Sequence, residues 1–284
     1  MSGKLVLCGT PIGNLEDIGP RALRTIGEAE VLACEDPRRT RKLLTHFGLK
    51  PRELVVLNEG NERRCSKELL RRVLAGRRVV LVSDAGMPGL SDPGYRLVRA
   101  CADAGAPVEV VPGPSAPITA LAVSGLPPGR FVFEGFMPRK SGDRRRKIAE
   151  LADERRTIVL FVSPHRVEES LEDLVQGLGD RPAALARELT KLHEEVRRGT
   201  LSQLLESVRA EPPRGEIVLV VGGAVHDHRS EAAPAELAHE ARRLMSEGAQ
   251  RRDAIGAVAR AAGVPKRRVF DALVEVGPEE EAGS

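Results

Sequence analysis

The chain has 284 residues, of which 41% are hydrophobic and 30% charged, and its formal net charge is +3. This is the profile of an ordinary soluble protein with enough chain for two cores and an appendage, and the low net charge means that any basic binding surface must be local. Aromatic residues are rare, with no Trp, one Tyr and six Phe, which argues against nucleic-acid binding by stacking of bases on aromatic side chains.

The four cysteines, at positions 8, 34, 65 and 101, lack the spacing of a metal site, so no bound metal is expected. Cys8 and Cys34 fall in apolar runs and are predicted to be small core residues. No segment reaches the roughly 18 apolar residues of a membrane span, and the N-terminus has no apolar stretch of signal-peptide length. We therefore expect a cytoplasmic protein with reduced thiols and no membrane contact.

Short apolar runs alternate with helical patterns up to about residue 223. The expected strands are residues 4–8, 30–34, 53–57, 78–83, 107–111, 130–134, 157–162, 183–187 and 216–221. Helical patterns such as 38–47, 62–75, 95–104 and 166–177 lie between most of them. The alternation predicts an α/β fold with parallel or mostly parallel strands covered by helices. The stretch 112–130 is rich in Pro and Gly, which predicts one α/β domain at 1–113 and a second at 114–225.

Three loops rich in glycine and proline follow predicted strands, at residues 9–14, 82–94 and 111–116. The second is much longer than the about 2–6 residues of an ordinary βα connection, so a tight turn alone is a poor explanation for it. A strand that runs into such a loop is how an open α/β sheet forms a ligand site at its carboxyl edge. The loops do not match GxGxxG, and the chain contains no GxxxxGK[ST], so these two nucleotide-binding motifs are absent.

The character of the chain changes after residue 223. Residues 226–234 form a polar linker, and 234–277 are predicted to be a small helical domain with helices at 236–247, 251–262 and 265–276. The last two helices resemble a helix-turn-helix, with Gly263 in the turn and three cations, Lys266, Arg267 and Arg268, opening the second helix. A helical tail with solvated cations fits the same pattern. The end of the chain, 279–284, is expected to be disordered.

Two groups of charged residues are candidates for the site. A dense basic run includes Arg139, Lys140, Arg144, Arg145 and Arg146, which suits contacts with phosphates, although a solvated helix face would look the same. Carboxylates follow two predicted strands, at Glu35, Asp36 and Glu59. Arginines adjoin the first two carboxylates, so mutual ion pairing is an alternative for them.

Seven segments of the chain occur together in one known family. They are GTPIGNLEDI at 9–18, ACEDPRRTRKLL at 33–44, VSDAGMPGLSDPG at 82–94, VPGPSA at 111–116, GFMPRKSGDRRRK at 135–147, RELTKLHEE at 187–195 and RGT at 198–200. In this the chain resembles the ribosomal small-subunit RNA 2'-O-methyltransferases, a branch of the tetrapyrrole methylase family. The resemblance implies S-adenosylmethionine as methyl donor and, as acceptor, the ribose 2'-hydroxyl of a cytidine in the decoding region of 16S rRNA. It also implies two α/β domains with the cofactor cleft between them, and a homodimer.

The three loops are assigned to this cofactor, because backbone groups in glycine-rich loops approach closely and supply both donors and acceptors. The assigned residues are Ile12 of the first loop, Asp84, Ala85, Gly86 and Met87 of the second, Ser115 and Ala116 of the third, and Phe161 and Ile217 at two strand ends of the second domain. A helix cap or a brace for the loop is an alternative role for Asp84.

Deprotonation of the acceptor hydroxyl requires a base within hydrogen-bond reach, unless the proton is lost late in the displacement. Glu35, Asp36 and Glu59 are the candidates, and His165 and His193 are weaker ones. In the resembled family histidines commonly occupy the positions of Asn58 and Gly60, so a histidine base there is not available to this chain.

Two competing functions fit parts of the pattern. One is a small-molecule tetrapyrrole methylase, against which the basic run and the added helical domain argue. The other is a transcriptional regulator that senses a ligand and binds DNA through the C-terminal helices; the three-loop cleft argues against that reading.

Overall fold

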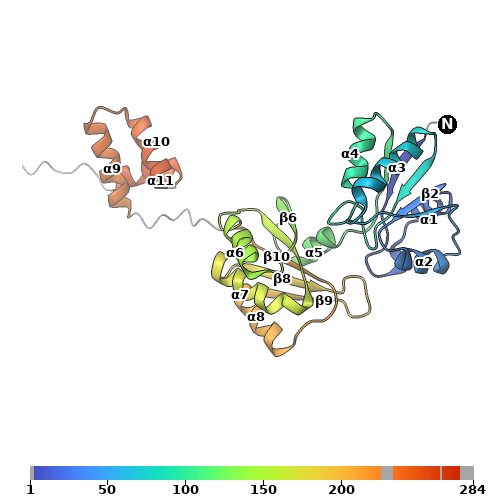
Figure 1. Cartoon of the computed structure of the whole chain (residues 1–284). Coiled ribbons are helices and arrows are strands. Elements are labelled where there is room, and N and C mark those ends of the chain that lie inside the picture. Colours follow the sequence, from blue (N-terminus) through green and yellow to red (C-terminus); the bar gives the residue numbers. More distant parts are fainter. Residues whose placement is uncertain (1–2, 225–232, 263, 276–284) are drawn as a thin grey trace, which may run out of the picture. The chain divides into compact units, whose positions relative to one another are not determined.

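The computed structural model describes residues 3–224, 233–262 and 264–275. The chain divides into two compact units, Met1–Ala224 and Val225–Ser284 (Figure 1). The first unit holds two five-stranded sheets and the second holds three helices, so the predicted α/β fold with a helical appendage is confirmed. The boundaries given for the domains stay a prediction.

The first sheet is wholly parallel and has the order β3-β2-β4-β1-β5. Its strands are β1 (Lys4–Cys8), β2 (Val31–Cys34), β3 (Leu54–Val56), β4 (Arg78–Leu81) and β5 (Val108–Val111). The connection that leaves β1 runs to β2 on one side, whereas the connection that leaves β4 runs to β5 on the other. The carboxyl ends of β1 and β4 therefore form a topological switch point, which is where open α/β sheets bind ligands.

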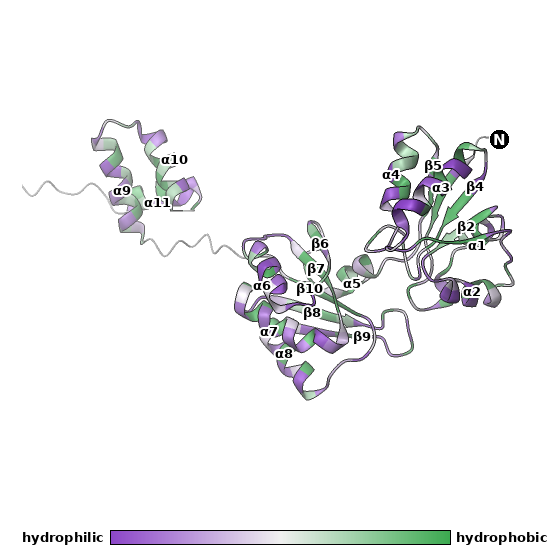
Figure 2. Ribbon diagram, in the orientation of Figure 1, coloured by the Kyte–Doolittle hydropathy of each residue, from purple (hydrophilic) through white to green (hydrophobic). Residues whose placement is uncertain are grey.

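Helices cover both faces of the first sheet. On one face α3 (Glu62–Leu74) and α4 (Tyr95–Asp103) bury a core that includes Leu69 and Leu97. On the other, α1 (Pro20–Gly27) and α2 (Pro37–His46) pack over a core that includes Ile26 and Leu44. Because both faces are buried, the inner strands are continuously apolar, and Figure 2 shows this as a hydrophobic sheet under amphipathic helices. All four cysteines are buried and free, as predicted for Cys8 and Cys34.

The second sheet is mixed and has the order β6-β7-β10-β8-β9. Its strands are β6 (Phe131–Phe136), β7 (Thr157–Val162), β8 (Pro182–Arg187), β9 (Glu195–Thr200) and β10 (Ile217–Val221). Only β6 and β7 pair in parallel, so the prediction of a mostly parallel arrangement is wrong for this sheet. The prediction fails because it overlooks β9, a charged edge strand without the apolar run by which the other strands were recognised. It follows β8 after a short turn and pairs with it antiparallel.

Helices α6 (Ser141–Glu150), α7 (Val167–Leu178) and α8 (Leu201–Ala210) share the largest core of the second sheet. Helix α5 (Ala116–Ser124) covers the opposite face through Ala120 and Leu121. Ile12, from the first loop of the other sheet, belongs to the same core. The two sheets are thus joined by shared apolar packing beside the switch point.

The C-terminal unit consists of α9 (Pro234–Ser246), α10 (Arg251–Ala261) and α11 (Lys266–Glu275), packed around Leu237, Val258 and Val269. These are the three predicted helices. Gly263, most of the predicted linker and the tail at 279–284 lie outside the described residues. Among the helices that are described, none is long and apolar enough to cross a membrane.

A buried ion pair ties α6 to α7 and generates a stability prediction. Arg144 Nε lies 2.6 Å from Asp173 Oδ2, and the two side chains are 4% and 5% exposed. Removing one partner strands a buried charge, so Asp173→Ala should lower the free energy of unfolding by about 3 kcal/mol in urea titrations. Asp143→Ala removes an exposed partner of Arg146 on the same helix and should cost less than about 1 kcal/mol. Equal effects of the two variants would contradict the buried pair.

Candidate functional site

Three loops meet at the carboxyl edge of the first sheet, at the switch point between β1 and β4. The backbone at Thr10 and Gly86 forms a two-way bridge, with N–O distances of 2.9 and 3.1 Å. Gly9 and Gly113 approach so closely that a Cβ on Gly113 would lie 2.8 Å from the Gly9 Cα. Glycine is required at these two positions because backbone from β1 meets backbone from β5.

The loops open into a cavity of about 980 Å³ that also reaches the second sheet. Its wall contains all nine residues assigned to the cofactor: Ile12, Asp84, Ala85, Gly86, Met87, Ser115, Ala116, Phe161 and Ile217. The volume lies at the top of the range for ligand sites of about 300–1,000 Å³, so the cavity has room for a cofactor and part of an acceptor. A smaller cavity of about 280 Å³ adjoins it behind Arg39 and Asp84.

Gly86 of the second loop lines this cavity, while its own backbone N–H and C=O groups are bonded to Thr10. That residue has φ +80°, and a Cβ there would lie 3.2 Å from both Ile12 Cγ2 and Pro114 O. The wall around it combines the Asp84 carboxylate with apolar side chains such as Met87, which matches a ligand that carries an adenine, a ribose and an amino-acid end. The residues present therefore fit S-adenosylmethionine.

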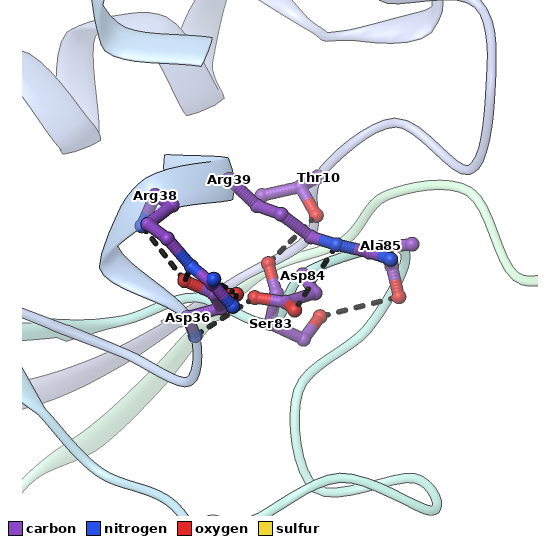
Figure 3. Close-up of polar contacts among 7 residues, drawn as sticks. All are labelled: Thr10, Asp36, Arg38, Arg39, Ser83, Asp84 and Ala85. Carbon is purple, nitrogen blue, oxygen red and sulfur yellow. Dashed lines mark hydrogen bonds and ion pairs between the residues drawn. The ribbon is translucent and has the colours of Figure 1, made fainter. Parts of the chain in front are cut away.

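Asp84 braces the site as well as lining it (Figure 3). Its Oδ1 accepts a hydrogen bond of 3.0 Å from the Asp36 backbone N–H, and its Oδ2 lies 3.7 Å from Arg39 Nε. Ser83 Oγ donates to Gly86 O at 2.9 Å, and Thr10 Oγ1 donates to Ser83 O at 3.2 Å. The bracing role that the sequence left open for Asp84 is thus present in the structure.

The three carboxylates considered as bases have different surroundings. Asp36 caps α2 and is paired with Arg38, whose hydrogen bonds lower the pKa of Asp36 to about 2. That pKa makes Asp36 a poor proton acceptor, and ion pairing is the explanation that holds for it. Glu59 is exposed and does not line the cavity, although it lies near enough to Glu35 for its charge to act on that residue. Only Glu35 lies on the wall, where burial and then the charges of Asp84 and Glu59 raise its pKa.

One carboxylate was missed by the sequence reasoning. Asp92, near the end of the second loop, also lies on the cavity wall. Burial, followed by the charges of Glu35 and Asp84, raises the pKa of Asp92 to about 7. The sequence offers one clue to Asp92, which is its place inside the loop at 82–94. Its position on the cavity wall could not be predicted, because it depends on how the fold turns the end of that loop back towards the cavity. His165 lines the cavity, whereas His193 does not.

The basic run divides between surface and interior. Arg139 lines the cavity, and Arg145 and Arg146 have side chains that are 68% and 71% exposed. Lys140 is exposed as well. Arg144 is different, since its side chain is buried against Asp173, so its assignment to RNA contact is corrected to a structural role. Arg144 lies four residues before the buried Ile148, which puts both on the inner face of α6.

Comparison with known proteins assigns the chain to a family. The family model described as Tetrapyrrole (Corrin/Porphyrin) Methylases matches residues 4–205, which include the first sheet and strands β6 to β9 of the second. The chain belongs to the tetrapyrrole methylase family. Methylases of this family use S-adenosylmethionine. In the part of the chain that the structure describes, no group of His, Cys, Asp and Glu is arranged to hold a metal ion.

Individual members of the tetrapyrrole methylase family show how far the likeness extends. The chain is 48% identical over 221 residues to ribosomal RNA small subunit methyltransferase I of Thermotoga maritima, covering 78% of this chain and 99% of that protein. It is 46% identical over 277 residues to the protein of that name from Mycobacterium tuberculosis, covering 96% and 95%. The crystal structure of uroporphyrin-III-C-methyltransferase from Thermus thermophilus has a TM-score of 0.54 at 26% identity and covers 78% of this chain and 94% of that one.

The raised pKa of Asp92 predicts a pH-dependent cost in stability. A carboxyl whose pKa rises from 3.8 to about 7 on folding binds its proton more tightly in the folded chain. The free energy of unfolding therefore falls as the pH rises through that interval. Asp92→Asn removes this contribution, so its melting temperature should exceed that of the wild type at pH 8 and approach it near pH 4.

The matched control for this melting experiment is Asp103→Asn. Asp103 is an exposed residue of α4 that pairs with Arg99. This variant should show no gain in melting temperature at pH 8. Failure of Asp92→Asn to gain stability at pH 8 would contradict the burial of an ionised carboxylate at that position.

Proposed function

We propose that the chain transfers a methyl group from S-adenosylmethionine to the ribose 2'-hydroxyl of a cytidine in the decoding region of 16S rRNA. The observation that carries this proposal is the cavity at the switch point, which takes its walls from three loops of one sheet and two strand ends of the other. Arg139 on its wall, followed in the chain by the exposed cations Arg145 and Arg146, adds a surface for an RNA acceptor. Relatives that match over most of the chain are named ribosomal RNA small subunit methyltransferase I, which supports the same reaction class and substrate.

The proposed roles follow from where the residues lie. S-adenosylmethionine, when bound, supplies a methyl group on a positively charged sulfur. The loop residues Ile12, Gly86 and Met87 would hold it against the carboxyl edge of the first sheet, and Ser115 and Ala116 would close the site from the start of α5. Most of the contribution of the protein to an in-line displacement is positioning, so a rigid set of loops is what the reaction needs.

The acceptor would approach from the side of α6. Arg139, Lys140, Arg145 and Arg146 are the exposed cations of the basic run, and Arg139 itself lines the cavity. Contacts of this type with phosphates position a nucleic acid and make its affinity fall as salt rises. We infer that these four side chains bind the backbone of the RNA around the target nucleotide.

We place the methyl-transfer chemistry in the first unit alone. The Thermotoga maritima relative is matched along 99% of its length by 221 residues, which leaves a stretch about the size of the C-terminal unit without a counterpart. The C-terminal helices would then add RNA affinity rather than a catalytic group. We also propose that the protein is cytoplasmic, where ribosomal subunits are found, and that it acts as a homodimer, which would double the basic surface offered to the subunit.

Incubation with radiolabelled S-adenosylmethionine tests this function. Label should enter small ribosomal subunits that lack the modification and should map to one cytidine ribose. Label in a tetrapyrrole instead would identify the small-molecule methylase. Binding of DNA by a chain that transfers no label to either acceptor would indicate the regulator.

Sedimentation at micromolar concentration tests the dimer, and a monomer that still methylates subunits would contradict it.

Two sets of variants should separate cofactor binding from RNA binding. Asp84→Asn removes a charged acceptor from the cavity wall and should weaken S-adenosylmethionine at least about tenfold by calorimetry. Arg145→Ala with Arg146→Ala should leave that affinity unchanged. It should weaken subunit binding and make its salt dependence shallower by about one unit per lost phosphate contact.

Arg99→Ala provides the matched control for these variants, since it removes an exposed arginine of α4 away from the basic run. It should alter neither the affinity for S-adenosylmethionine nor the binding of small subunits. Loss of both affinities in either Asp84→Asn or the double arginine variant would contradict the proposed division of roles.

A further inference from the structure

Glu35 and Asp92 differ from the other carboxylates on the cavity wall. In the part of the chain that the structure describes, neither Glu35 nor Asp92 forms an ion pair. The other acidic groups of the wall do, since Asp84 lies 3.7 Å from Arg39 and Glu216 lies 3.1 Å from Lys191. An unpaired carboxylate that is partly withdrawn from water costs stability, which is tolerated mainly where the group has a function.

The turn that presents Asp92 is held firmly. Glu62 Oε1 accepts hydrogen bonds from the backbone N–H groups of Gly94 at 2.9 Å and Arg96 at 3.2 Å, and so fixes the start of α4 directly after the turn. Ser91, the residue before Asp92, has a left-handed φ of +64°. Non-glycine residues in that conformation cost free energy and are found mostly where the surroundings impose a function. The backbone on both sides of Asp92 is therefore held in place by the fold.

The same turn borders the part of the cavity that faces the basic run. A Cβ built on Gly135 of β6 would lie 3.4 Å from Ser91 Oγ, so the turn lies against the end of that strand. Phe136, which follows, lines the cavity although it is 63% exposed, and the chain then continues to Arg139. Met87 and Asp84, from the other end of the loop, lie among the cofactor residues. Asp92 is thus placed between the proposed cofactor and the proposed path of the RNA.

We propose that Asp92 is the catalytic residue that accepts the proton of the acceptor hydroxyl. This inference rests on the proposed function. The hydroxyl O–H bond breaks and its proton moves to a carboxylate oxygen of Asp92. The hydroxyl oxygen forms the new bond to the methyl carbon, while the carbon–sulfur bond breaks and leaves its electron pair on sulfur. Charge balances, because one carboxylate is neutralised as one sulfonium becomes a thioether.

The charges around Asp92 favour this role. Burial, followed by the negative charges of Glu35 and Asp84, raises the pKa of Asp92 to about 7. A general base is most effective when its pKa lies near the pH of the reaction. The other charged or titratable groups on the same wall are Arg39, Arg139, His165, Arg166 and Glu216.

The test uses the full chain and small ribosomal subunits under single-turnover conditions at saturating S-adenosylmethionine, from pH 5.5 to 8.5. The wild-type rate should rise with pH and level off above about 7. Asp92→Asn should lower the plateau by about 10²- to 10³-fold and abolish the rise, because it keeps the shape of the side chain but cannot take a proton. Its calorimetric affinity for S-adenosylmethionine should stay within about twofold of the wild type.

Asp103→Asn, which makes the same exchange at an exposed position of α4, should match the wild type in rate and pH profile. An Asp92→Asn variant with an undiminished rate, or with a reduced rate but the same pH profile, would overturn the proposal. A loss of cofactor affinity equal to the loss of rate would make Asp92 a cofactor residue and would overturn it too. A wild-type chain that methylates no subunits would refute the proposed function itself.

Discussion

Backbone contact between the three loops is the constraint on which the rest of the site depends. β1, β4 and β5 end side by side, and their loops come together because Gly9 and Gly113 have no side chains to hold them apart. The Thr10–Gly86 bridge then fixes the second loop against the first. Once these contacts exist, Ile12 can reach the core of the second sheet, and the cavity acquires walls from both sheets. A larger residue at position 9 or 113 would act on the fold and on the ligand site together.

The carboxylates of the site have different surroundings, and these differences determine their chemistry. Asp36 is a helix cap and Asp84 is a brace with a weak cationic partner, whereas Asp92 and Glu35 form no ion pair with any residue that the structure describes. Hydrogen bonds from Arg38 lower the pKa of Asp36, whereas burial and neighbouring negative charge raise the pKa of Asp92. A site that holds a cationic cofactor and must also take up a proton needs both kinds of carboxylate, and the loop at 82–94 supplies one of each.

The sequence predicted the first sheet well and the second sheet only in part. Apolar runs revealed the buried strands of both, but the edge strand Glu195–Thr200 is charged and offers no apolar run to detect. All nine residues assigned to the cofactor line one cavity. Those of the first two loops converge because they follow strands β1 and β4 of one parallel sheet, whereas Phe161 and Ile217 come from the second, mixed sheet. Asp92 is missed by the sequence pattern and Arg144 is assigned wrongly for a different reason. Whether a charged side chain faces solvent, a cavity or a core partner depends on long-range packing that a local pattern does not contain.

We expect the cofactor on the loop side of the cavity in the first unit, with the wall around Asp92 and Phe136 left free for the acceptor. A crystal structure with bound S-adenosylhomocysteine would locate the ligand. It should lie against residues 9–14, 84–87 and 115–117, with the Asp92 carboxylate and the Phe136 ring uncovered. A ligand bound elsewhere, or one that covers Asp92, would show that the cofactor and acceptor sides have been assigned wrongly.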